Sequence, residues 1–266
     1  MSTRPTTRAT LVRAGNASPM TLDGTNTWVL VEPGQGSAIV VDPGPNDSRH
    51  LKAILDAMRE AEATEVALVV LTHGHADHAE SAAAFAASAG SVVRAAAADR
   101  CVGAEKLTDR ESIDVAGLRL DVVATPGHTA DSVCLVVVGD RALLTGDTIL
   151  GHGSTVVAHP DGRLADYLQT LEKLRLLVDE RGLSVVLPGH GPVREDPAAL
   201  IAEYRAHREQ RLGQVRAAIA AGADTIDAVL ARVYGDVDAS LQHAARWSLL
   251  AQLDYLSENG EPTPAA

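Results

Sequence analysis

The chain has 266 residues, 46% of them hydrophobic, so it can bury a core the size of one globular domain or more, and a disordered protein is excluded. Its formal net charge of −12 argues against a broad surface for nucleic-acid phosphates. Cys101 and Cys134 form no C-x-x-C pattern, so we expect no disulfide framework and a reducing, cytoplasmic location. We expect no membrane span, and a frayed terminus over the first 14 residues.

The first part of the chain predicts strands that alternate with helices. Apolar runs over 27–31 and 38–41 flank a Pro-Gly turn and predict an antiparallel hairpin. The chain order that follows predicts one crossover unit with a parallel strand pairing. It consists of a helix with Ser48 as N-cap, a buried strand, a second helix and a short strand, over 48–63, 66–71, 80–89 and 91–94.

The second part predicts further strands and then helices alone. Its expected elements are a hairpin broken by Gly117, two strands around a Gly139-Asp140 turn, a helix and a strand, over 113–125, 133–138, 141–144, 164–179 and 183–187. From Pro197 the pattern is helical, with helices expected over 198–221, 225–235 and 239–257. We therefore predict a main domain over 1–195 and a smaller helical domain over 196–266.

Polar residues follow four of the predicted strands at the point where each ends. Residues 72–78, Thr-His-Gly-His-Ala-Asp-His, place three imidazoles and a carboxylate together, and His128, Asp147 and His190 each sit beside a glycine after a later strand. Considered alone, a His-rich loop also fits a solvated turn. Side chains at like-facing strand ends can converge, however, and these donors suit zinc and related divalent metals. The sequence therefore predicts a metal site; Asp42, before Pro43 and Gly44, is by itself more typical of a turn.

These residues, in this order across residues 20–195, resemble the metallo-β-lactamase superfamily. The resemblance implies an α/β (α+β) fold, an αββα sandwich with a metal centre on one edge. The segments 24–27, 145–151 and 188–192 are similar to the β-lactamase-like protein 2 group within it. The helical tail is similar to the winged-helix-like C-terminal domain of that group at Tyr204, His207, Arg208, Arg211, Gln214 and Val215.

By position, the resemblance implies two metal ions, expected to be Zn²⁺, with Mn²⁺ or Fe²⁺ as alternatives. The first would be held by His73, His75 and His128, the second by Asp77, His78 and His190, and Asp147 would bridge them. Asp42 would be an outer carboxylate that orients a ligand. Two such ions can share one water and lower its pKa, and Asp77 would orient the resulting hydroxide. We therefore predict a hydrolase.

The substrate is less constrained than the chemistry. The close resemblance makes single-stranded RNA phosphodiesters the leading substrate, and acyl thioesters and β-lactams are alternatives, although the best-known lactamases have a cysteine where this chain has Asp147. His152 and Tyr204 are the candidate substrate contacts. From another class, residues 73–78 also resemble the persulfide dioxygenases, which hold a single iron. We predict no membrane partner, and the oligomeric state stays open, with a homodimer as one alternative.

Overall fold

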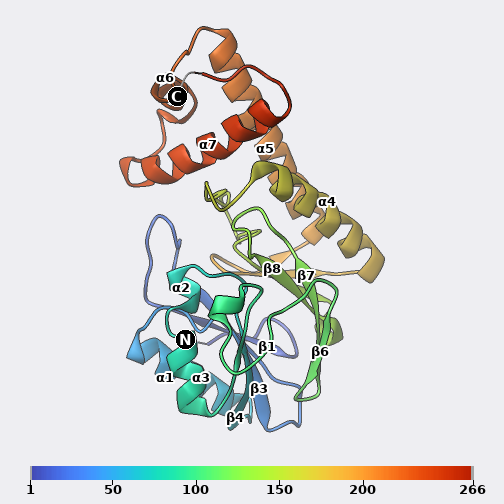
Figure 1. Cartoon of the computed structure of the whole chain (residues 1–266). Helices are drawn as coiled ribbons and strands as arrows, with labels where there is room; N and C mark the ends of the chain where they lie inside the picture. The colour runs from blue at the N-terminus through green and yellow to red at the C-terminus, as the bar shows by residue number, and fades with distance from the viewer. Residues whose placement is uncertain (1, 265–266) are drawn as a thin grey trace.

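The computed structural model describes residues 2–264, which form two facing β-sheets with helices outside them and a helical region beyond (Figure 1). The first sheet has the order β1(Ala9–Arg13), β2(Asn26–Leu30), β3(Ser37–Val41), β4(Glu65–Val70) and β5(Val93–Arg94). Strands β1 to β3 pair antiparallel, whereas β3, β4 and β5 pair parallel. The helices α1(Ser48–Glu60), α2(Ala76–Ala79) and α3(Ala82–Ala89) lie between its strands in the chain.

The second sheet is antiparallel except at one pairing. Its order is β11(Arg194–Glu195), β10(Val185–Pro188), β9(Ala142–Gly146), β8(Val133–Val137), β7(Leu118–Ala124) and β6(Ser112–Val115). Strands β9 and β10 pair parallel because α4(Leu164–Arg181) connects them as a crossover. The two mixed sheets confirm the predicted fold class.

Successive residues of one strand serve two different cores. On β2 and β3, Leu30 and Ile39 point between the sheets, whereas Val29 and Val40 point outward to meet Ile54 of α1. Because both faces of this sheet are covered, its inner strands are almost wholly apolar, as predicted for residues 66–71. The sheet is therefore covered on both sides, and the polar residues of the candidate metal site follow the ends of its strands.

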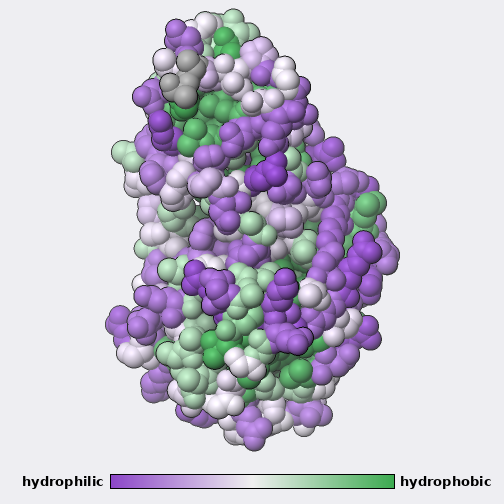
Figure 2. All heavy atoms as spheres, in the orientation of Figure 1, coloured by the Kyte–Doolittle hydropathy of each residue, from purple (hydrophilic) through white to green (hydrophobic). Residues whose placement is uncertain are grey.

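The helical region comprises α5(Pro197–Ala220), α6(Ile226–Tyr234), the 3₁₀ turn Ala239–Leu241 and α7(Gln242–Glu258). Its apolar side chains, among them Val215, Val229 and Leu249, share one cluster with Leu171 of α4 and Leu143 of β9. Hydrophilic residues cover most of the face in Figure 2, and hydrophobic ones surface in patches, one of them in the helical region at the top. The predicted helical region is confirmed, and its winged-helix character stays a prediction.

Several predicted details are wrong. Residues 9–13 are not a frayed terminus but strand β1, which the short apolar run 9–12 forms by pairing with β2. The N-cap of α1 is Asp47, whose carboxylate accepts a hydrogen bond from the Arg49 amide, and Ser48 lies inside the helix. The turn after β8 is a 3₁₀ turn over Val138–Asp140, followed by Arg141 in the left-handed region, rather than a two-residue hairpin turn.

The strand ends that carry the polar residues meet at one edge. Strands β3 and β4 are parallel, as are β9 and β10, and β7 runs in the direction of β9 because both are antiparallel to β8. Within each sheet the carboxyl ends of these strands therefore lie on the same side. The approach of His73, after β4, to Asp147, after β9, shows that both sheets present these ends at one edge. Among the described residues, no helix is both long and apolar enough to cross a membrane.

Candidate metal centre

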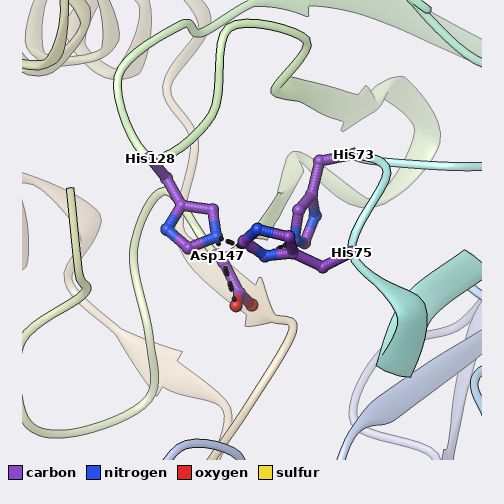
Figure 3. Close-up of side chains that lie close together, drawn as sticks. All are labelled: His73, His75, His128 and Asp147. Carbon is purple, nitrogen blue, oxygen red and sulfur yellow. Dashed lines mark hydrogen bonds and ion pairs between the residues drawn. The ribbon is translucent and has the colours of Figure 1, made fainter. Parts of the chain in front are cut away.

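All seven predicted ligands lie together at this edge, in two groups. In each group the candidate ligand atoms are within 4.8 Å of one another. The first group contains His73, His75, His128 and Asp147 (Figure 3), and the second contains Asp77, His78 and His190. The short helix α2 makes the second group feasible, because it turns Asp77 and His78 away from the extended segment that carries His73 and His75.

In the first group, three imidazoles face one another. Nδ1 of His75 lies 3.1 Å from Nε2 of His73 and 3.1 Å from Nε2 of His128. Burial lowers the pKa of His128 to about 4, and burial together with His78 holds the pKa of His73 well below its usual value. Neutral imidazoles with converging nitrogens are the form in which histidine binds a divalent metal.

Asp147 connects the two groups. Its Oδ2 lies 3.7 Å from Nε2 of His128 in the first group and 3.3 Å from Nε2 of His190 in the second. Within the second group, Nε2 of His190 lies 3.2 Å from Nε2 of His78 and 3.2 Å from Oδ2 of Asp77. The carboxylate of Asp147 thus lies between the two groups and is close to a histidine of each.

The charge balance of the centre fits cations. Burial opposes ionisation of Asp147, but His190 and His78 outweigh it and hold the pKa of the carboxyl well below its usual value. Its Oδ1 is nevertheless buried without a hydrogen bond to any described residue, and Nε2 of His78 is 3.4 Å away. A buried carboxylate oxygen without a partner is costly, and a divalent cation between the two groups would satisfy it. Imidazole and carboxylate donors of this kind suit divalent metal ions.

Groups behind the ligands fix the orientation of the rings. Nδ1 of His78 lies 2.9 Å from Oδ2 of Asp42, and the same carboxylate accepts hydrogen bonds from the amide and hydroxyl of Thr72 at 2.8 and 2.7 Å. Nδ1 of His128 lies 2.6 Å from the carbonyl oxygen of Val156, to which it donates. Each contact engages the outer nitrogen and turns Nε2 toward the centre, which sets the tautomer of the ligand.

Sequence reasoning missed two supporting hydroxyls. Thr25 donates to Oδ2 of Asp77 at 3.0 Å, and Thr155 donates to the carbonyl oxygen of Asp147 at 2.5 Å. Both threonines are buried, at 0% and 3% exposure. Their segments lie 52 and 8 residues from the groups that they contact, and nothing local in the sequence marks those pairings.

A cavity of about 280 Å³ opens onto the centre. His128, Asp147 and the predicted contact His152 line one side, and side chains of the helical region line the other. Tyr204 does not line this cavity: it is buried at 4% exposure, and its hydroxyl accepts a hydrogen bond from the Leu150 amide at 2.9 Å. It supports the loop after Asp147 rather than facing this cavity.

Comparisons with known proteins agree with this geometry. Residues 20–190 match the model of the metallo-beta-lactamase superfamily. The lactamase-like protein aptB of Emericella nidulans is 32% identical over 96% of this chain and 82% of its own length. The beta-lactamase-like protein 2 homolog of Drosophila melanogaster is 30% identical over 97% and 91%, and the atrochrysone carboxyl ACP thioesterase of Aspergillus chevalieri is 31% identical over 88% and 75%.

Solved structures share the arrangement of both parts of the chain. A metallo-beta-lactamase family protein from Thermus thermophilus has a TM-score of 0.78 at 23% identity, with 94% of this chain and 93% of that chain covered. Since the coverage extends past residue 190, the fold likeness includes helical residues beyond the family match.

Proposed function

The chain belongs to the metallo-beta-lactamase superfamily, and from this premise we propose that it is a dinuclear zinc hydrolase that cleaves acyl thioesters. One observation carries the proposal: Asp147, which connects the two ligand groups, lines a cavity together with His128, and apolar side chains such as Leu22, Val237 and Leu241 form part of its walls. The thioesterase name of the Aspergillus chevalieri relative supports the same class of substrate. We also propose that residues 1–195 form the catalytic domain and residues 196–266 a second domain beside it.

The metal ions would be held by His73, His75, His128, Asp77, His78, His190 and the bridging Asp147, with zinc favoured over manganese or iron. When bound, such a pair supplies a water of lowered pKa and stabilises negative charge on the attacked carbonyl. Asp42 holds the ring of His78 in the tautomer that this requires.

Asp77 is the proposed catalytic residue. Burial opposes its ionisation, but the contact with His190 outweighs it and lowers the pKa of this carboxyl to about 2. With Oδ2 engaged by Thr25 and His190, Oδ1 is the oxygen that we expect to accept the hydrogen bond of the attacking water. The water oxygen forms a bond to the thioester carbon, the C–S bond breaks, and the sulfur leaves with the electron pair. Because a thiolate leaves readily near neutral pH, no dedicated acid is needed, and the protons released from water go to the sulfur and to solvent.

The cavity is better suited to an acyl group than to RNA. Its far wall contains Val237, Leu241, Ala244 and Ala245 of the helical region, and Met20 and Leu22 cover it from the segment before β2. A volume of about 280 Å³ is in the range of a small ligand site rather than a groove that follows a strand of nucleotides. The net charge of −12 also opposes a polyanion.

The test compares three substrates with the zinc-loaded protein: an acyl thioester, single-stranded RNA and a chromogenic β-lactam. We expect the thioester to have the highest kcat/KM, and Asp77→Ala and His128→Ala to lower turnover by at least about a hundredfold. His243→Ala, which removes an exposed histidine of α7, is the matched control. Faster cleavage of RNA or the lactam would contradict the substrate proposal. Full activity in either ligand variant, with the fold checked by circular dichroism, would contradict the site.

A further inference from the structure

Helix α5 carries arginines of two kinds. Arg205 pairs with Glu172 and Glu209, each at 3.0 Å, on the outside of the molecule. Arg208 and Arg211, at the next two positions of the same spacing, line the cavity instead. Within residues 2–264, neither has a carboxylate oxygen within 4.0 Å, although the chain as a whole has 35 acidic residues.

Arg208 is a buried cation without an anionic partner. Arg208 is 6% exposed, and its Nη2 donates to the carbonyl oxygen of Thr155. The guanidinium lies 5.0 Å from the ring centre of Tyr167. Its Nε is buried and makes no hydrogen bond among the described residues. A carbonyl and a ring face offset a buried charge only in part, so this side of the cavity would gain from an anion.

Arg211 adds a second positive charge one helical turn further. Nη1 donates to Oε1 of Gln214 at 3.0 Å and to the carbonyl oxygen of Val233 at 2.9 Å, and the guanidinium lies 5.0 Å from the ring centre of Tyr234. Residues three apart on a helix lie on one face, so the two guanidiniums can approach the same ligand. Both of these bonds go to neutral acceptors, which leaves the charge of Arg211 without compensation by an acid.

His207, directly before Arg208 on the same helix, lines the cavity as well but adds no charge. Burial, and then the neighbouring Arg208 and Arg211, lower the pKa of His207 to about 4, so its ring is neutral at pH 7. Its Nδ1 is buried and unpartnered in the described chain. The wall therefore presents two positive charges and a neutral imidazole to a cavity whose other side holds His128 and Asp147.

We propose that Arg208 and Arg211 form a subsite for a carboxylate on the acyl part of the substrate, so that the enzyme prefers thioesters whose acyl group ends in an acid. This inference rests on the proposed thioester hydrolysis and names the substrate class within it. A carboxylate matches a guanidinium fork in two parallel hydrogen bonds, and the apolar walls accept the methylene groups between acid and thioester. The hydrolysis itself is unchanged: the C–S bond breaks at the far end of the acyl group.

A kinetic test uses two thioesters of the same thiol and chain length, glutaryl and pentanoyl, which differ in the terminal carboxylate. We expect the zinc-loaded enzyme to favour glutaryl, and Arg211→Gln to lower the glutaryl-to-pentanoyl ratio of kcat/KM by about tenfold or more, mainly through KM. Arg208→Lys keeps the charge but not the fork, and we expect a smaller fall in the ratio. Arg205→Gln is the control from the same helix. An unchanged ratio in Arg211→Gln would overturn the subsite.

A binding test needs no metal and no turnover. Pentanoate is titrated into the metal-free protein and followed by NMR, with pentanamide as the neutral isostere and inorganic phosphate as the competing anion. We expect pentanoate to bind, and Arg211→Gln, but not Arg205→Gln, to weaken it by about tenfold or more. Equal binding of pentanamide, or tighter binding of phosphate at the same arginines, would overturn the carboxylate assignment.

The two tests separate the subsite from the reaction. If no thioester is hydrolysed while pentanoate binds in an Arg211-dependent way, the proposed function fails and the subsite stands. If thioesters are hydrolysed with a ratio that ignores Arg211→Gln, the subsite fails and the proposed function stands.

Discussion

The candidate metal centre and helix α5 line the same cavity. Buried charges have partners of opposite charge at the centre, whereas on α5 they do not. At the centre, acids and imidazoles face one another, so that Asp147 contacts both His128 and His190. On α5, Arg208 is as deeply buried but faces no acid in the described chain. A balanced cluster completed by metal ions suits bond cleavage, whereas an unbalanced cation suits the choice of substrate. The difference suggests that the strand ends supply the reaction and the helical region supplies selectivity.

The largest expected effect comes from adding one methyl group at the centre. A Cβ at Gly189 would lie 2.5 Å from Oδ1 of Asp147 and 2.8 Å from Cε1 of His78, so Gly189→Ala must displace both ligands. We expect at least about a hundredfold loss of turnover and of zinc affinity, measured by steady-state kinetics and chelator competition. Gly213→Ala on α5 is the matched control: its Cβ meets nothing within 4 Å, and we expect a gain in stability of up to about 1 kcal/mol. Normal zinc affinity in Gly189→Ala would contradict the site geometry.

His50, which lies outside the centre, tests whether a buried histidine without an acidic partner makes the stability of the fold depend on pH. The Thr27 hydroxyl donates to the carbonyl oxygen of Asp42 at 2.6 Å and so accepts from Nε2 of His50 at 2.8 Å. Nδ1 of His50 is buried and has no hydrogen-bond partner within residues 2–264. Burial lowers the pKa of His50 to about 4, with Asp47 opposing the shift. Because the folded state then holds its proton less tightly than the unfolded state, the stabilisation is complete above about pH 6.5 and is lost as the pH falls toward 4.

The loss at His50 should amount to about 3 kcal/mol of unfolding free energy. His50→Gln keeps the donor to Thr27 without a titrating group, so we expect it to flatten this part of the pH profile. Urea denaturation of the metal-free protein and the variant between pH 7 and pH 4.5 measures the difference. Parallel profiles for the two proteins would show that His50 does not contribute.

A smaller effect on metal affinity is expected from replacing Asp42, whose carboxylate holds the ring of His78. Asp42→Asn keeps the size of the side chain but weakens its hold on Nδ1 of His78. We expect zinc affinity to fall by about tenfold to a hundredfold, measured by chelator competition. Asp140→Asn is the control, since that carboxylate is also shielded but pairs with Arg8 at 2.8 Å, away from the centre. An equal loss in both variants would mean that Asp42 acts only through general stability.

The sequence predicted the candidate site best where a metal-binding residue type directly follows a predicted strand and has a glycine beside it. The ligands follow apolar strands beside glycines, so His73, His128 and His190 could be predicted to converge without knowledge of the packing. Arg208 could not be assigned to the cavity in this way. It lies between Tyr204 and Leu212 on the buried stripe of α5 and belongs to the residues that carry the resemblance of the helical tail. Whether such an arginine meets an acid or a cavity depends on segments far away in the chain.

Strand β1 and the Thr25 hydroxyl illustrate the same limit. A five-residue strand is indistinguishable from a short apolar run until its partner β2 is known. Thr25 lies in segment 24–27, which carries part of the family resemblance, but only the fold places its hydroxyl 3.0 Å from Asp77. Long-range pairing, rather than composition or periodicity, decides both.

The most direct test of the account is the metal content of the purified protein, measured by elemental analysis together with oxygen uptake in the presence of a persulfide. We expect two zinc ions per chain, fewer in His128→Ala, and no oxygen consumption. One iron per chain with oxygen uptake would contradict a dinuclear hydrolase.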